Sequence, residues 1–456
     1  MDHVRLSPGL RAGGADATTF VTVYVVLLVC LPARLVFAPL GAAGTPAQVL
    51  GIAGAGWWLW HHCARRQSSA PRVAPVRRAM LLFAASVLTS FVAATLRPID
   101  AVELATGTMG LLSLLSWLGV LLVIHDGITD RERLDVLLRR LTVAAGLVAV
   151  LGLTQFATGR AFTDLIQVPG LSVSTPLFGV AERDGLPRPA GTALSPIEFG
   201  VFLSMTLPLA IHYAVQDAHR GRGLLRRWLP VAALSAVIPL CISRSALLGT
   251  VVVLAFLAPT WTRSMRRWTA LAIGLVLSTA FVLVPGLLGS LLKLFTGISN
   301  DNSAASRTDS YPLAWEFIVR DPLLGRGFLT FLPKYRILDN QYLLQLVDTG
   351  VVGLVCLLVV LVTGIIVGLR LRDRLTDAAD RDLALSLSGG IAAGAASFAF
   401  FDALSFPMVA GAVFLQIGAV GALSRTTIED PGDAVDAVDA VDAVDGQPPL
   451  AYADAS

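Results

Sequence analysis

The chain has 456 residues, of which 55% are hydrophobic and only 15% are charged, and its mean hydropathy is +0.71. This composition excludes an ordinary soluble domain, in which about a quarter of the residues are charged. The formal net charge of +3 comes from arginines near apolar segments, so it indicates membrane topology and gives no reason to expect nucleic-acid binding. We predict an all-α polytopic membrane protein.

Twelve stretches approach the roughly 20 apolar residues that a helix needs to cross a hydrocarbon core about 30 Å thick. The first contains Pro32 and Arg34, and it could be a signal peptide with Arg5 and Arg11 before it. Because the apolar run continues past any cleavage point, we interpret it as a signal anchor. The helices are expected near 19–38, 45–61, 79–95, 103–125, 141–157, 194–214, 228–242, 245–260, 269–290, 341–368, 383–401 and 406–424.

The basic residues predict the orientation of these helices. If residues 1–18 lie in the cytoplasm, 23 of the 35 Lys and Arg fall on the inner side, as the positive-inside rule requires. An even number of helices then returns the C-terminus to the cytoplasm. The last segment, 426–456, carries an acidic repeat of Asp-Ala-Val and is predicted to be a disordered cytoplasmic tail after a membrane domain over 19–425.

Two outer segments, 158–193 and 291–340, are much longer than most other connections, and the larger precedes the tenth helix. Long connections without a domain of their own are typical of functional or disordered segments. Aromatic and apolar residues within them indicate ordered structure. The spacing of such residues predicts a short helix over 311–319 that lies on the membrane and ends before Pro322 and Gly325.

Arginines in the outer segments run against the topological bias. Arg188 precedes the sixth helix, Arg244 lies in the turn between the seventh and eighth, and Arg307 lies in the long loop. Each could be an interfacial anchor whose stem reaches the headgroups. The alternative is a clamp for pyrophosphate, because guanidinium groups bind phosphate oxygens bidentately.

A cluster of polar residues, Asp339, Asn340, Gln341 and Tyr342, stands directly before the tenth helix. One residue of this kind is explained by an N-cap that satisfies free N–H groups. Four in a row exceed that need, and Asp348 inside the helix requires a partner or a water-filled cavity. All six histidines fall on the inner side, so an outer catalyst would need a carboxylate as its base. The histidine and carboxylate spacings predict no metal site.

Short motifs follow one another along the chain in a characteristic order. They are Arg-x-x-Gly and Pro-x-x-x-Gly within 188–200, Ser-Arg-Ser at 243–245, Asp-Pro-Leu-Leu-Gly-x-Gly at 321–327, Asp-Asn-Gln-Tyr-Leu at 339–343 and Asp-Thr-Gly-Val-Val-Gly at 348–353. Over roughly residues 180–360 the chain therefore resembles the O-antigen ligase and O-antigen polymerase-like superfamily of bacterial membrane glycosyltransferases. The resemblance implies an all-helical fold in the bacterial cytoplasmic membrane, with an outer cap.

The resemblance also implies transfer of a glycan from a polyprenyl-pyrophosphate carrier to an acceptor hydroxyl, with no metal or other cofactor. The implied partners are this donor, the glycan acceptor, the lipid bilayer and other polysaccharide assembly proteins. Ligases of the family often carry His where Asp339 stands here, and relatives often carry His where Ser195 stands. The departure at Asp339 favours a polysaccharide polymerase over a ligase. A lipid-linked oligosaccharide flippase is the competing class, although the helix centres hold few of the ionisable residues that transporters need.

The hypothesis assigns a role to each residue. Arg188, Arg244 and Arg307 hold the pyrophosphate leaving group. Asp339 accepts the proton of the acceptor hydroxyl. Glu198 is the second-choice base. The expected substrate-binding residues are Asn340, Gln341, Tyr342, Trp315 and Glu198.

Overall fold

The computed structural model describes residues 16–64, 74–174, 179–219, 221, 223–296 and 310–427. Its helices confirm the all-α polytopic class, and every one of the twelve expected helices has a counterpart. They are α1 (Ala17–Cys30), α2 (Pro46–Ala64), α3 (Pro75–Thr95), α4 (Ala101–Gly127), α5 (Arg131–Thr158), α6 (Pro196–His219), α7 (Leu224–Leu240), α8 (Arg244–Leu257), α9 (Arg263–Leu283), α13 (Gln341–Arg374), α14 (Ala378–Ser397) and α15 (Pro407–Thr427).

By length and composition, eight of the described helices can cross a membrane: α3, α4, α5, α6, α9, α13, α14 and α15. The first helix is shorter than expected. The 14 residues of α1 rise about 21 Å, which is less than the hydrocarbon thickness of about 30 Å. α1 alone therefore does not fill the apolar layer.

Two expected helices end early. The first ends at Cys30 and not near residue 38, because Pro32 cannot continue the helix and the chain turns into a strand, β1 (Leu35–Val36). β1 pairs with β2 (Ser172–Val173) in antiparallel register. The ninth ends at Leu283 and not near 290, because Pro285 is followed by Gly286 at φ +90°. A separate helix, α10 (Leu287–Thr296), follows.

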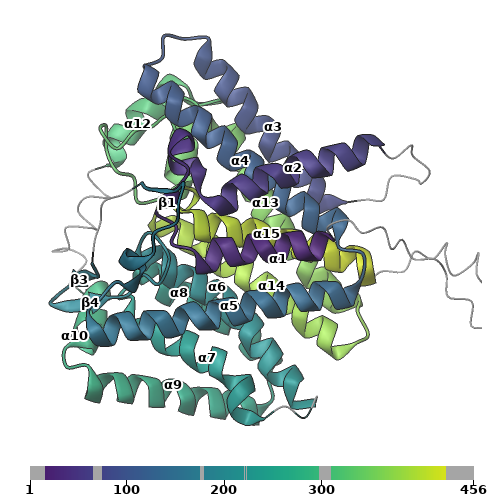
Figure 1. Ribbon diagram of the computed structural model, residues 1–456, viewed down its shortest axis with the longest axis vertical. Helices are drawn as coiled ribbons and strands as arrows, with labels where there is room; N and C mark the ends of the chain where they lie inside the picture. The colour runs from purple at the N-terminus through teal and green to yellow at the C-terminus, as the bar shows by residue number, and fades with distance from the viewer. Residues whose placement is uncertain are drawn as a thin grey trace, which may run out of the picture.

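Short elements gather at one end of the long helices. Figure 1 shows β1, α10, α12 and the β3–β4 hairpin together on the left side of the view. α12 confirms the expected short helix near 311–319. The remaining elements are η1 (Ala38–Gly44), η2 (Phe162–Leu165), β3 (Ala181–Arg183), β4 (Leu186–Arg188), η3 (Ala258–Thr260), α12 (Tyr311–Arg320), η5 (Phe398–Phe400) and η6 (Ala403–Ser405).

The helices differ greatly in how much they bury. α15 lies at the centre, with 94% of its most apolar window buried, whereas none of the α9 window is buried. Trp117 of α4 stacks on Phe414 of α15 at 5.2 Å between ring centroids and meets Phe328 edge-on at 6.3 Å. These aromatic contacts join the core to the loop that follows α12.

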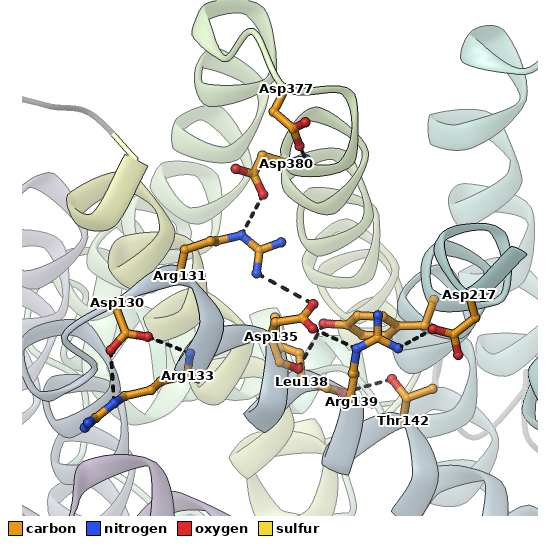
Figure 2. Close-up of polar contacts among 11 residues, drawn as sticks. Asp130, Arg131, Arg133, Asp135, Leu138, Arg139, Thr142, Asp217, Asp377 and Asp380 are labelled. Carbon is orange, nitrogen blue, oxygen red and sulfur yellow. Dashed lines mark hydrogen bonds and ion pairs between the residues drawn. The ribbon is translucent and has the colours of Figure 1, made fainter. Parts of the chain in front are cut away.

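The other end of the bundle holds a cluster of ion pairs, drawn in Figure 2. Arg131 donates to Asp380 at 2.6 Å, and Arg139 bonds Asp135 at 2.7 Å and Asp217 at 2.8 Å. We name these five residues the inner ion cluster. It ties together the ends of α5, α6 and α14.

Candidate active site at the outer ends of the helices

The β3–β4 hairpin carries Arg188 to the end of α7 that the arginine pattern predicts to be outer. Asp184 and Gly185 have positive φ angles of 52° and 76°, which suits a tight two-residue hairpin turn. The register places Arg183 opposite Leu186, so Arg183 and Arg188 share one face. Arg188 Nε donates to the Cys241 carbonyl oxygen at 2.8 Å. Burial, together with the charge of Arg183, lowers the pKa of Arg188.

Arg244 is the first residue of α8 and follows Cys241 by three residues. Its Nε donates to the Leu294 carbonyl oxygen of α10 at 2.6 Å. Arg188 therefore binds Cys241 in the same short α7–α8 turn that presents Arg244. Two of the three predicted arginines thus meet at one turn, and the third, Arg307, lies outside the described residues.

The polar cluster before α13 contains one structural cap. Asn340 Oδ1 accepts from the N–H groups of Tyr342 at 3.0 Å and Leu343 at 3.2 Å, which confirms the N-cap. Tyr342 also donates its hydroxyl to the Ala395 carbonyl of α14 at 2.6 Å. Both residues therefore make bonds that hold the start of α13 in place.

Gln341 joins the start of α13 to the turn between α14 and α15. Its side-chain oxygen accepts from Leu404 N–H at 2.9 Å, and its own N–H donates to the Phe401 carbonyl at 3.1 Å. Asp402 lies between these two contacts. Half-buried Asp339 is two residues before Gln341. The turn and the helix start therefore bring Asp339 and Asp402 together.

Asp402 is a residue that the sequence reasoning missed. Burial raises its pKa to about 6, the hydrogen bond from Ser405 opposes this rise, and the charge of Asp339 adds to it. An interaction between two carboxylates is one of the arrangements that tune the pKa of an acid or a base. The available signal was a lone Asp in a short connection between two apolar helices.

Glu198 is fully buried at the start of α6. One carboxylate oxygen accepts from Leu194 N–H at 2.8 Å and the other from Met408 N–H at 2.7 Å. Asp402 interacts with it electrostatically. The bonds of Glu198 connect α6 to α15, so its first role is to position these helices.

α14 links the arginines to the carboxylates. Ser397 Oγ donates to the Ser245 carbonyl, next to Arg244, at 3.0 Å. The chain then runs on through η5 to Asp402, and Ala395 lies just before and accepts from Tyr342. A single segment, 395–402, therefore touches both halves of the site.

Trp315 lies apart from this group. Its side chain is 64% exposed on α12. Within the part of the chain that the structure describes, no hydrogen bond or ring contact joins Trp315 to the carboxylates or to the arginines. Its expected role in stacking on a sugar stays a prediction.

Two motifs, 321–327 and 348–353, interlock next to the site. Val351 N–H donates to the Pro322 carbonyl at 2.9 Å, and Gly327 N–H donates to the Asp348 carbonyl at 2.7 Å. Gly325 and Gly350 have φ angles of +66° and +64°, and a Cβ on either would collide with the other segment's backbone. Gly350 has a non-helical backbone conformation inside α13, and the loop packs against this break in the helix.

Asp348 has its partner in this interlock. Its carboxylate accepts from Leu329 N–H at 2.9 Å and Phe331 N–H at 3.1 Å. These bonds meet the need that the sequence predicted for an acid inside a helix. Among the described residues, no group of three or more His, Cys, Asp and Glu could hold a metal ion. Metal independence stays a prediction.

The fold and this site define a polytopic membrane protein whose candidate site lies at one end of the helix bundle. Residues 229–358 match a family model described as O-antigen ligase. The match includes Arg244, Asp339 and the interlocked motifs. It confirms the resemblance to the O-antigen ligase-like superfamily and supports glycan transfer of the ligase or polymerase type. A search of curated proteins gives no match to this chain.

Proposed function

We propose that the protein transfers a glycan from a polyprenyl-pyrophosphate donor to an acceptor sugar at the outer face of the membrane, and that it extends a polysaccharide. The observation that carries this proposal is the segment 395–402, which links the arginine turn to the Asp339–Asp402 pair. Cations for a leaving phosphate and carboxylates for a hydroxyl proton are the groups that this transfer needs. The bilayer supplies the donor lipid.

The acceptor hydroxyl oxygen attacks the anomeric carbon, and the bond from that carbon to the pyrophosphate oxygen breaks. Asp339 takes the hydroxyl proton, a step typically worth about 10²–10⁴ in rate. Asp402 stabilises the protonated form of Asp339, because a shared proton removes the repulsion between two carboxylates. Arg188, Arg244 and Arg307 stabilise the charge on the pyrophosphate that leaves with the polyprenyl carrier.

The remaining residues orient these groups. Asn340 and Tyr342 fix the start of α13, and Gln341 holds Asp402 beside it. Glu198 sets the position of α15 through Met408, so it serves as a positioning residue before it serves as a base. Trp315 lies apart from these groups and has no step in this mechanism.

Polymerase is favoured over ligase because Asp339 stands where ligases of the family often carry His. The ligase remains the alternative within the same chemistry. A flippase would bind its substrate near the middle of the bilayer. The ion pairs of the inner ion cluster lie instead at helix ends (Figure 2), as do Arg188, Arg244 and Asp339, which favours an enzyme that works at the membrane surface.

The test is a reconstituted assay with a polyprenyl-pyrophosphate-linked oligosaccharide. The length of lipid-linked product and the release of free polyprenyl pyrophosphate are followed for the wild type, Arg244→Ala and Asp339→Asn. We expect longer lipid-linked chains from the wild type and loss of extension in both variants. Transfer to a non-lipid-linked acceptor would identify a ligase. Glycan movement across the bilayer without a new glycosidic bond would identify a transporter.

A further inference from the structure

The short helix α12 has three distinct faces. One face is buried and packs on Phe331 and Leu338. The exposed part divides into two rows with a spacing of four residues, one apolar and one charged at its last two positions. The buried face consists of Ala314, Phe317 and Ile318, the apolar row of Tyr311, Trp315 and Val319, and the second row of Pro312, Glu316 and Arg320.

The apolar row is strongly exposed. Tyr311 is 48%, Trp315 64% and Val319 59% exposed. Large apolar side chains in a continuous row are unusual on a surface that faces only water. The neighbouring row places Glu316 and Arg320 about 100° further round the helix, where charged groups reach solvent.

The apolar row continues onto a membrane-spanning helix. Leu323, 64% exposed, extends the row beyond the end of α12. The carbonyl oxygens of Pro322 and Leu323 accept from Val351 N–H at 2.9 Å and Val352 N–H at 3.2 Å. Val351 and Val352 are themselves 46% and 40% exposed on α13, one of the spans. The row therefore joins a surface that faces lipid.

We propose that α12 lies in the outer leaflet, at the boundary between headgroups and acyl chains. Tyr311, Trp315 and Val319 enter the lipid, and Glu316 and Arg320 face water. Amphipathic helices bury their apolar side about 5–10 Å into this boundary, and Tyr and Trp prefer it. The ligand of the row is therefore the phospholipid itself.

This contact supports the loop that leads to Asp339. On the buried face of α12, the Phe317 ring lies 4.5 Å from the guanidinium of Arg326. Arg326 in turn donates to Glu103 of α4 at 2.8 Å, and the Tyr335 hydroxyl donates to the same carboxylate. The lipid-bound helix is thus connected to the first turn of α4. The inference holds whatever reaction the outer site performs.

The experiment compares adjacent positions on the two exposed rows. The native thiols Cys30, Cys63, Cys241 and Cys356 are replaced. Single variants Trp315→Cys and Val319→Cys are then labelled with a small fluorophore, with Glu316→Cys and Arg320→Cys as matched controls. Each protein is placed in phosphatidylcholine vesicles with or without a lipid that carries a nitroxide on its acyl chain, and aqueous iodide is added separately.

We expect the nitroxide lipid to quench the labels at 315 and 319 several-fold more than those at 316 and 320, and iodide to show the reverse order. Equal iodide quenching at all four positions would overturn the proposal, because the apolar row would then face water. Protection of 315 and 319 from both quenchers would also overturn it, since a second copy or another segment would then cover the row. Activity is not needed for this readout, so failure of the glycosyltransferase proposal would not affect it.

Discussion

The inner ion cluster and the candidate site hold their arginines in different ways. At the inner end, Arg131 and Arg139 donate to the carboxylates of Asp380, Asp135 and Asp217. At the outer end, Arg188 and Arg244 donate to backbone carbonyl oxygens. A carboxylate neutralises the charge of a guanidinium, whereas a carbonyl only orients it.

The electrostatic surroundings of Arg188 extend this contrast. Burial and the nearby Arg183 lower the pKa of Arg188, because the loss of water and the neighbouring positive charge both disfavour its charged form. An incoming pyrophosphate would relieve this repulsion. We infer that the arginines of the inner ion cluster stabilise the fold, and our proposal has the Arg188 guanidinium, oriented by a carbonyl oxygen, bind the anion.

The largest effect is expected at Arg188. Arg188→Ala should reduce the rate of glycan transfer by about 10²–10³, as removal of a group that stabilises the leaving charge does. Arg188→Lys should recover only part of the rate, because lysine lacks the bidentate fork. The measurement is the initial rate of chain extension in vesicles with equal amounts of folded protein. Full activity in Arg188→Ala would show that Arg188 does not stabilise the leaving pyrophosphate.

The second effect concerns Asp402. If its ionised form assists Asp339, the wild-type rate should fall as the pH is lowered through about 6, the value to which burial raises the pKa of Asp402. Asp402→Asn should lower the rate by about 10-fold to 100-fold and remove this inflection. The pH–rate profiles of both proteins provide the test. An unchanged inflection in the variant would assign it to another group.

Asp402 should also affect the stability of the fold, which should rise as the pH is lowered, whereas the rate should fall. Because its pKa is raised above the usual value of about 4, the stability from the neutral carboxyl is present below about pH 4 and is lost as the pH rises through about 6. At pH 7 the wild type therefore bears the cost of a buried charge. Asp402→Asn should have the higher melting temperature at pH 7 and little advantage at pH 4.

The third effect belongs to the inner ion cluster. Arg139→Ala removes a guanidinium whose partners Asp135 and Asp217 are mostly buried. Because Asp135 keeps its longer ion pair with Arg131 at 3.7 Å, the loss of the Arg139 cation should cost about 2 kcal/mol of unfolding free energy, less than the loss of a sole partner. The rate per folded molecule should remain near that of the wild type. Denaturant titration gives the first quantity and the transfer assay the second, and a selective loss of rate would contradict the assignment.

The smallest effect is expected at Lys334, which pairs with Asp100 at 2.7 Å near the outer surface. Both side chains are about half exposed, so water and salt screen the pair. Lys334→Ala should change neither the melting temperature nor the rate measurably. This variant is the control for outer basic residues that take no part in the site, and a clear loss of activity would extend the site toward α4.

The helices could be predicted because each depends on a local property, an apolar run of sufficient length. The Asn340 cap, the Ser-Arg-Ser turn before α8 and the short α12 were equally local. The early end of α9 also has a local cause, Pro285 and Gly286. It was missed because the apolar pattern continues past these residues.

The carboxylate pair could not be predicted in this way. Asp339 and Asp402 lie in different segments, and their approach depends on how Gln341 binds the turn between α14 and α15. The motifs 321–327 and 348–353 were recognised in the sequence, but the contact between them was not predicted. Their interlock depends on a loop that folds back onto a helix, which neither segment encodes alone.

The isolation of α9 bears on how its sequence can change. None of its residues is buried, and it meets the rest of the protein mainly through its ends and α10. Lipid then sets almost the only requirement on its interior, which is length and hydrophobicity. Its interior can therefore drift freely among apolar residues, so related chains should differ more there than in α15, where nearly every position contacts a neighbour.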